Sequence, residues 1–257
     1  MEEMVLLKPK LTRLKMSGVL ETFKDRLDQA MKDKWSYSQF LDCLLSDEVE
    51  RRDHKQLCRL LSKSGLDPEK SLETFDFSFN PCIHEPTIRE LASCFFMEKK
   101  ENPFFCGPSG VGKSHLAQAL GHQAARRGHE VLFRRTCSLL QWIGAGRGDG
   151  TYDRRMKYAA SVSLLVVDDF GLKPLNEQEQ EDLYELICER YEKASTIITS
   201  NRDFAEWMSV FSNPLMGSAA MDRLVHRGIK ILIEGKSYRV DSFAKRTRGA
   251  PTPAAKE

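Results

Sequence analysis

The run Gly107-Pro-Ser-Gly-Val-Gly112-Lys113-Ser114 matches the pattern G-x-x-x-x-G-K-S/T in full, and it constrains the fold more than any other feature of the chain. Its glycines let the backbone curl so that successive N–H groups point into one concavity, which suits phosphate oxygens. An apolar stretch, Phe104–Cys106, precedes it and a helical pattern, Ser114–Arg127, follows it, as a phosphate loop requires. The pattern predicts a nucleotide site with contacts from Gly107, Pro108, Ser109, Gly110, Val111, Gly112, Lys113, Ser114 and His115.

Apolar stretches alternate with helical patterns from about residue 84 to residue 240. Besides the stretch before the phosphate loop, the candidate strands are Val131–Phe133, Leu164–Val167, Thr196–Thr199 and Ile229–Ile233. Helical segments such as Glu177–Lys193 lie between them. Short apolar strands separated by helices are typical of a parallel sheet covered on both faces. The expected fold class is therefore α/β, with a central parallel sheet between helices.

The first 63 residues have a helical pattern without strand candidates. Apolar residues recur there at helical spacing, as at Leu20, Phe23, Leu27 and Met31, after a possible cap at Ser17. A second helical pattern opens near Ser36, and Gly65 followed by Pro68 indicates its end. We expect a small all-α domain over residues 1–68, the α/β domain over residues 69–242, and a disordered tail over residues 243–257.

Composition limits the location and the charge of the protein. Of its 257 residues, 41% are hydrophobic, but no apolar run approaches the roughly 20 residues that span a bilayer. The N-terminal residues also lack a secretory leader, so we expect a cytoplasmic protein with no membrane partner. Because the net charge is only +2, any nucleic-acid binding must depend on local basic clusters.

Polar residues follow two of the candidate strands. The strand at Leu164–Val167 ends in Asp168 and Asp169. A core strand that merely stops at polar residues would look the same, but a position about 50 residues after a phosphate loop favours a magnesium site. Ser114 and Asp168 would then hold Mg²⁺, Lys113 would reach the β- and γ-phosphates of ATP, and Asp169 would orient or deprotonate the attacking water.

A third polar signal is Thr199-Ser200-Asn201, at the end of the β-branched strand. Asn201 could hydrogen-bond the attacking water or the γ-phosphate. Ser-Asn is also common where a strand turns into a loop, so this signal by itself does not decide between the two interpretations.

In this order, the three motifs resemble those of AAA+ ATPases, and more narrowly of the IstB-like transposition helpers and the related DnaC-type helicase loaders. The resemblance covers nearly all of residues 70–240. Beyond the three motifs, it rests on Asp76-Phe-Ser-Phe79, Asp168-Asp-Phe-Gly171, Thr199-Ser-Asn-Arg202, Glu206-Trp207, Met221-Asp222-Arg223-Leu224 and Gly235-Lys-Ser-Tyr-Arg239. It implies a bacterial AAA+ ATPase that acts on DNA.

The resemblance also implies roles for single residues. Asn201 would be the sensor of the γ-phosphate, and Arg223 the arginine finger that completes the ATP site of a neighbouring subunit. The residues alone favour an ordinary helix ion pair of Arg223 with Asp222 or a neighbour. The chain departs from many AAA+ proteins in carrying Asp169 in place of a glutamate. It also ends soon after Val240, so we expect no separate lid domain.

Two basic regions are candidates for DNA contact. Arg51, Lys55, Arg59 and Lys63 recur every four residues and form one stripe on a helix, which could equally be a solvated face. The glycine-rich stretch Gly144–Gly150 carries Arg147 and precedes Arg154 and Arg155, which predicts a flexible basic loop that leads into a helix. An exposed loop without this role is the alternative.

These expectations converge on one leading hypothesis and two alternatives. The first is an ATP-dependent regulator of transposition, which forms a decamer-like or helical homo-oligomer on double-stranded DNA and recruits a cognate transposase. The second is a loader adaptor for a replicative helicase, of the DnaC type. The third is an ATP-binding scaffold that has lost turnover.

Overall fold

The computed structural model describes residues 2–241 and residue 243, and it separates into two compact units, Met1–Arg59 and Leu60–Glu257. The predicted tail over residues 243–257 lies outside the described residues, apart from Phe243. Among the described residues of the first unit there are helices and no strand, as predicted. Its helices are α1 (Glu2–Arg13), α2 (Ser17–Asp33) and α3 (Tyr37–Ser64), the last of which runs on into the second unit.

The sequence signals at the two ends of α3 are confirmed. Before the helix, the Ser36 hydroxyl accepts a hydrogen bond from the Gln39 N–H at 3.3 Å, and the Gln39 side chain accepts one from the Ser36 N–H at 2.9 Å. This reciprocal pair caps the N-terminus of the helix. The helix ends at Ser64 because Gly65 adopts a left-handed conformation, with φ of 75°.

The start of α2 is capped from a distance instead of by its own sequence. Ser17 is already the first helical residue, and no side chain in the cap position accepts a hydrogen bond. The Glu48 carboxylate on α3 accepts from the N–H groups of Gly18 at 2.6 Å and Val19 at 3.4 Å. Such a carboxylate satisfies unpaired amides and complements the helix dipole. Around this contact, Val19, Phe23 and Leu44 form the small core of the unit.

Replacing Gly18 with alanine should destabilise the protein by about 1–3 kcal/mol, because the two helices already touch there. A Cβ atom at Gly18 would lie 2.8 Å from the Glu48 Cα atom and 2.9 Å from the Asp47 carbonyl oxygen. Gly148→Ala is the matched control. Gly148 is also helical but has nothing within 4 Å, so alanine there should stabilise by up to about 1 kcal/mol. Urea unfolding followed by circular dichroism measures both; equal effects of the two substitutions would refute the close-approach argument.

The second unit contains a five-stranded parallel sheet in the order β2-β3-β4-β1-β5. The strands are β1 (Asn102–Cys106), β2 (Val131–Arg135), β3 (Leu164–Phe170), β4 (Ser195–Ser200) and β5 (Gly228–Leu232). They confirm the five predicted strands and the α/β class. Within the described residues, no separate lid domain follows β5.

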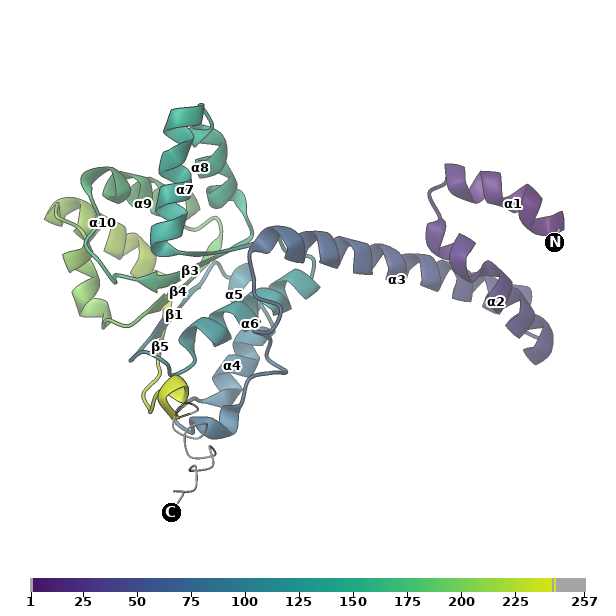
Figure 1. Cartoon of the computed structure of the whole chain (residues 1–257), viewed down its shortest axis with the longest axis horizontal. Coiled ribbons are helices and arrows are strands. Elements are labelled where there is room, and N and C mark those ends of the chain that lie inside the picture. Colours follow the sequence, from purple (N-terminus) through teal and green to yellow (C-terminus); the bar gives the residue numbers. More distant parts are fainter. Residues whose placement is uncertain (1, 242, 244–257) are drawn as a thin grey trace, which may run out of the picture. The chain divides into compact units, whose positions relative to one another are not determined.

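Helices cover both faces of this sheet (Figure 1). On one side lie α4 (Glu85–Ala92), α5 (Phe95–Glu98) and α6 (Lys113–Arg126). On the other lie α7 (Thr136–Asp149), α8 (Tyr152–Ser161), α9 (Glu177–Arg190) and α10 (Pro214–Val225). The unit also contains two short 3₁₀ helices, η1 (Phe77–Phe79) and η2 (Phe204–Val210), and residues 238–241 are helical.

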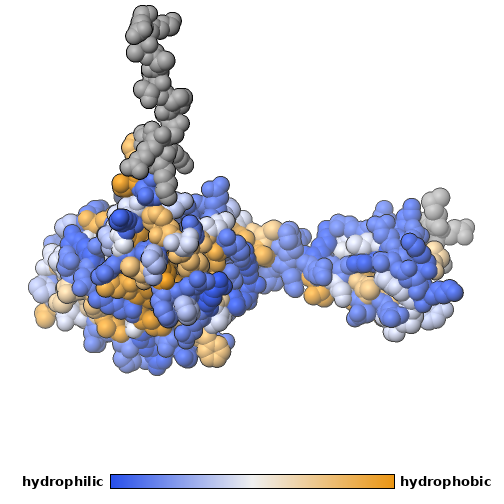
Figure 2. All heavy atoms as spheres, turned by 90° about the horizontal axis from the view of Figure 1, so that it is seen from below, coloured by the Kyte–Doolittle hydropathy of each residue, from blue (hydrophilic) through white to orange (hydrophobic). Residues whose placement is uncertain are grey.

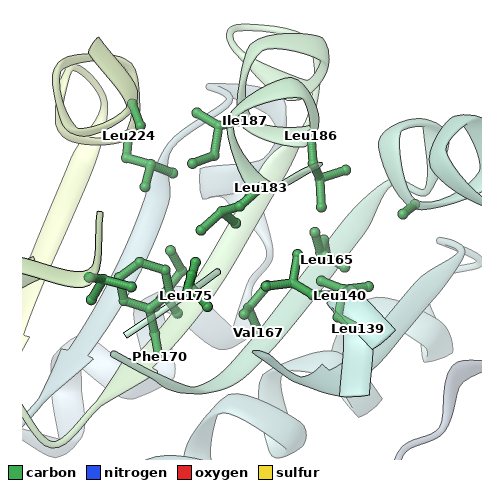
Figure 3. Close-up of a cluster of buried hydrophobic side chains, with 14 of the residues drawn as sticks. Leu139, Leu140, Leu165, Val167, Phe170, Leu175, Leu183, Leu186, Ile187 and Leu224 are labelled. Atoms are coloured by element: carbon green, nitrogen blue, oxygen red, sulfur yellow. The ribbon is translucent and has the colours of Figure 1, made fainter. Parts of the chain in front are cut away.

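The main hydrophobic core lies between the sheet and the second group of helices. Figure 3 shows Leu183, Leu186 and Ile187 of α9 facing Leu165 and Val167 of β3. All five are buried, as parallel strands covered by helices must be. This packing holds α9 and α10 against the sheet whose edge carries the polar residues discussed below.

A buried arginine also joins elements of this layer. Arg190, 3% exposed, donates to the carbonyl oxygens of Ala159, Ala160 and Val162 at 3.0, 3.1 and 2.9 Å. These oxygens lie at the C-terminal end of α8, where a positive charge is favourable. Its Nε atom also donates to the Thr196 hydroxyl on β4. Arg190 therefore fixes the end of α8 to α9 and β4.

Hydrophilic residues make up most of the surface visible in Figure 2, with apolar residues between them. Within the part of the chain that the structure describes, no helix combines the length and the apolar character needed to cross a membrane.

Candidate nucleotide site

Three loops meet at one edge of the sheet because its strands are parallel. The phosphate loop follows β1, Asp168 and Asp169 lie at the end of β3, and Asn201 follows β4. Since β4 lies between β3 and β1, these segments are neighbours. The Gly107 N–H donates to the Ser200 carbonyl at 3.2 Å, which ties the start of the phosphate loop to the end of β4. Ligands of open α/β sheets bind at this edge.

The phosphate loop has the backbone that its glycines permit. Gly107, Gly110 and Gly112 have φ of 147°, 85° and 103°, a region that other residues rarely adopt. The loop leads directly into α6, so the unpaired N–H groups of the first helical turn face the same space. A Cβ atom at Gly112 would lie 2.9 Å from the Phe75 ring, so glycine is also required for the close approach of that ring.

Lys113 links the phosphate loop to Asn201. Its ammonium donates to the carbonyl oxygens of Gly107 and Pro108, both at 2.7 Å, and to the Asn201 Oδ1 atom at 2.6 Å. The side chain is 5% exposed, and burial lowers the pKa of its ammonium, although Asp169 and Asp168 oppose that shift. The predicted phosphate-binding lysine and the predicted sensor therefore lie in direct contact.

Thr199 contacts both aspartates, the carboxylate of Asp168 and the backbone of Asp169. Its hydroxyl donates to the Asp168 Oδ1 atom at 2.5 Å and accepts from the Asp169 N–H at 3.1 Å. The pairing between β3 and β4 is irregular between Val167 and Phe170, so the strand bulges where the two aspartates lie. Bulges next to functional sites often redirect a side chain. Asp168 is thus buried against Thr199, while Asp169 is one-third exposed.

The backbone at Asp169 gives a physical reason for aspartate in place of glutamate. Its φ is 57°, in the left-handed region where Asp and Asn are enriched among residues with side chains. Burial and the neighbouring Asp168 raise the pKa of the Asp169 carboxyl group, while Arg135, Lys113 and Arg239 oppose this shift. Arg135, the last residue of β2, places its Nε atom 3.9 Å from the Asp169 Oδ2 atom.

His115 contributes its side chain to the wall of the site. Its Nε2 atom lies 2.8 Å from the Ser71 carbonyl oxygen, and its ring packs edge-on against Phe75 at 5.0 Å. Burial lowers the pKa of the imidazole, which favours the neutral ring that donates Nε2–H to Ser71. The side chain of this predicted nucleotide contact therefore holds the segment before η1 against the phosphate loop.

Arg223 contacts groups on α10 and α9, and not the residues described above. On α10, its Nη1 atom donates to the Ala219 carbonyl at 2.8 Å, and its guanidinium lies over the Tyr184 ring of α9 at 5.6 Å from the centroid. Those contacts replace the ion pair with Asp222 that was the alternative interpretation from the sequence. Arg223 is therefore half-buried between α10 and α9, and its role at a neighbouring subunit's site stays a prediction.

The residues at this edge fit MgATP. The N–H groups at the start of α6 and the Lys113 ammonium are donors for phosphate oxygens. Ser114 and Asp168 offer two oxygens for Mg²⁺, which commonly takes one or two protein ligands together with phosphate and water. Among the residues that the structure describes, no group of three or more His, Cys, Asp or Glu side chains could hold a metal ion by itself.

Sequence reasoning missed two residues at this edge. Thr199 lies within the third motif, but no role was predicted for it. Its hydroxyl contacts both aspartates. Arg239 belongs to the last motif of the family resemblance, but no role was predicted for it. Its charge lowers the pKa of both Lys113 and Asp169. The N–H of Tyr238 donates to the Gly110 carbonyl at 2.9 Å, which brings this distant segment to the phosphate loop. A hydroxyl at the end of the β-branched strand Thr196–Thr199 was the available signal for Thr199.

The basic stripe predicted on α3 is present, but its members differ in surroundings. Arg51 pairs with Glu21 of α2 at 2.8 Å, whereas Lys55 and Arg59 are exposed. In the second unit, the prediction of a flexible loop over residues 144–150 is wrong, because α7 continues to Asp149. Leu139, Leu140 and Ile143 bury one face of that helix. A Cβ atom at Gly146 would lie 2.7 Å from the Tyr152 backbone, so glycine permits α8 to pack closely.

The arginines of this region are also more engaged than predicted. Arg147 forms a two-pronged ion pair with Asp182, whose side chain is 2% exposed, and lies over the Tyr152 ring at 4.1 Å. Arg155 binds Asp149 and the Trp142 carbonyl, both at 2.6 Å. Arg154 is exposed. Of the three arginines predicted here to contact DNA, Arg147 and Arg154 are exposed, and Arg155 is half-buried.

Comparisons with known proteins agree with this geometry. The model of the IstB-like ATP binding protein family matches residues 9–246. The chain is 37% identical over 235 residues to an ATP-binding protein of insertion sequence IS21 from Pseudomonas aeruginosa, covering 91% of this chain and 89% of that protein. A similar protein from Mycobacterium tuberculosis is 36% identical over 230 residues, covering 89% of this chain and 92% of that one.

Solved structures show the same fold. The AMPPCP-bound DnaA from Aquifex aeolicus matches with a TM-score of 0.55 and 25% identity, over 72% of this chain and 56% of that chain. The DnaC helicase loader matches with a TM-score of 0.50 and 26% identity, over 58% of this chain and 86% of that chain.

Proposed function

We propose, from the premise that this chain belongs to the family of IstB-like ATP-binding proteins, that it is a DNA-dependent ATPase that assists transposition. In this proposal it binds MgATP, assembles as a homo-oligomer on double-stranded DNA, and recruits or activates a transposase. Hydrolysis then dissolves the assembly. The observation that carries the ATPase part is the meeting of Lys113, Asn201, Asp168 and Asp169 at one edge of the sheet.

The proposed chemistry divides among these side chains. Lys113 holds the β- and γ-phosphates, while Ser114 and Asp168 hold Mg²⁺, which neutralises charge on the transferred phosphoryl group. Asp169 orients the attacking water and accepts its proton, because its carboxylate lies partly exposed at this edge beside Asp168. Asn201 reports whether a γ-phosphate is present, since its amide oxygen already contacts Lys113.

Arg223 is the residue that makes hydrolysis depend on oligomerisation. A guanidinium supplied by a neighbouring subunit stabilises the charge of the transition state, so hydrolysis depends on assembly. Support comes from its position outside its own subunit's cluster of site residues, on α10 against Tyr184. Two observations support the DNA part of the proposal. The basic side chains of Lys55, Arg59 and Arg154 are exposed, and the relatives are named as insertion-sequence proteins.

The proposal is tested by ATP hydrolysis with Mg²⁺, measured with and without duplex DNA while light scattering follows assembly size. We expect duplex DNA to raise both turnover and size, and only when ATP is present. Stimulation by single-stranded DNA or by a replicative helicase alone would favour the loader function that the DnaC likeness suggests. ATP binding without turnover under any of these conditions would leave an ATP-binding scaffold.

A further inference from the structure

Arg223 is held by two contacts within its own subunit. Its Nη1 atom donates to the Ala219 carbonyl one turn earlier on α10, and its guanidinium lies 5.6 Å from the centroid of the Tyr184 ring. A guanidinium within about 6 Å of a tyrosine ring is attracted by the negative face of the ring. The carbonyl and the ring together restrict a side chain that otherwise samples many rotamers.

The ring is itself on a well-anchored helix. Two residues before Tyr184, Asp182 accepts a two-pronged ion pair from Arg147 and a hydrogen bond from the Tyr152 hydroxyl at 2.8 Å. At the other end of α9, the Tyr191 hydroxyl lies 3.0 Å from the His226 Nδ1 atom after α10. Tyr184 is therefore placed by contacts on both sides of it along α9.

We propose that Tyr184 is a positioning residue for Arg223, which it holds in the orientation that the ATP site of a neighbouring subunit requires. The inference rests on the proposed role of Arg223 and adds a residue that acts through it. A guanidinium that is already restricted loses less rotational freedom when it reaches the transition state. Tyr184 should therefore influence the rate of hydrolysis in the assembly and leave nucleotide binding unchanged.

The test compares two substitutions of Tyr184 in the full chain. Tyr184→Leu removes the aromatic face, and we expect DNA-stimulated kcat to fall about two- to fivefold, the range of an exposed cation–π contact. The KM for ATP should not change. Tyr184→Phe keeps the aromatic face and should retain wild-type turnover. If the hydroxyl of Tyr184 were the important group, Tyr184→Phe would also lower turnover. If Tyr184→Leu does not fold, Tyr184→Met replaces it, because methionine fills irregular space without an aromatic face.

Tyr158→Leu is the matched control, since it makes the same chemical change at another half-buried tyrosine, on α8. The Tyr158 ring packs edge-on against Trp142 of α7 at 6.3 Å, so its loss should leave stimulated turnover unchanged. A double variant completes the test. In the Arg223→Ala background, Tyr184→Leu should have no further effect on kcat, because the group that it positions is absent.

The outcomes separate this inference from the function on which it rests. If Arg223→Ala retains wild-type stimulated turnover, the arginine-finger role in the proposed function is wrong. If Arg223→Ala abolishes stimulation but Tyr184→Leu matches the wild type or Tyr158→Leu, Tyr184 does not position Arg223, and the proposed function stands. A further loss caused by Tyr184→Leu in the Arg223→Ala background would also overturn the inference.

Discussion

Replacing Lys113 with alanine is expected to weaken ATP binding about a hundredfold or more. The ammonium is the buried cation of the phosphate loop, and charged hydrogen bonds in such sites are each worth about 1.5–3 kcal/mol. The free protein should remain folded, since burial already disfavours this charge, as its lowered pKa indicates. Titration with a fluorescent ATP analogue measures the affinity, and thermal unfolding measures the stability.

The same thermal measurement supplies an independent check. A ligand that binds the folded state raises the melting temperature, so ATP should stabilise the wild type but not Lys113→Ala. Lys193→Ala serves as the control, because Lys193 is a surface lysine whose ammonium pairs only loosely with Glu189 at 3.3 Å. Unchanged ATP affinity and turnover in Lys113→Ala would refute the phosphate-site prediction.

Replacing Asp169 with asparagine should lower turnover by about 10²–10⁴-fold, the usual contribution of a general base, without loss of ATP binding. The change is close to isosteric, and asparagine tolerates the left-handed backbone that Asp169 adopts. The ATP-bound state should then accumulate, so that assemblies on duplex DNA persist. Turnover is measured by phosphate release, and the lifetime of the assembly by light scattering after free ATP is removed.

Asp168→Asn is the companion of that substitution. Asp168 accepts from Thr199 and is the proposed Mg²⁺ ligand, so its loss should weaken Mg²⁺-dependent binding as well as turnover. The two neighbouring aspartates thus have distinguishable predictions. Wild-type turnover in Asp169→Asn would exclude it as the base and shift attention to Asp168 and Thr199.

Much of the fold follows from local sequence signals. The five strands were predictable because each is a short apolar run, and a parallel sheet covered on both faces buries all of it. The end of α3 was predictable because Gly65 can adopt a positive φ at low cost. The positions of Lys113, Asp168 and Asn201 at one edge of the sheet followed from the direction of parallel strands, although their catalytic roles stay predictions.

The failures of sequence reasoning share a cause. Residues 144–150 contain four glycines and were expected to form a loop, but packing of Leu140 and Ile143 and the approach of α8 at Gly146 favour a helix. A glycine within a helix costs about 1 kcal/mol relative to alanine. The free energy gained by burying the apolar face of α7 is larger than this cost. No signal in the sequence indicated the partner of Arg147, the buried Asp182 35 residues away, whereas the DNA contact predicted for Arg147 stays a prediction.

The order of residues along the chain was sufficient for the phosphate loop, the alternation of strands and helices, and the family resemblance, because each depends on neighbours within a few positions. Folding was needed to bring together groups that are far apart in sequence. Glu48 caps α2, Arg190 closes the end of α8, and Thr199 joins the two aspartates. Those partners are chosen by packing of the hydrophobic cores, and no periodicity in the sequence encodes that choice.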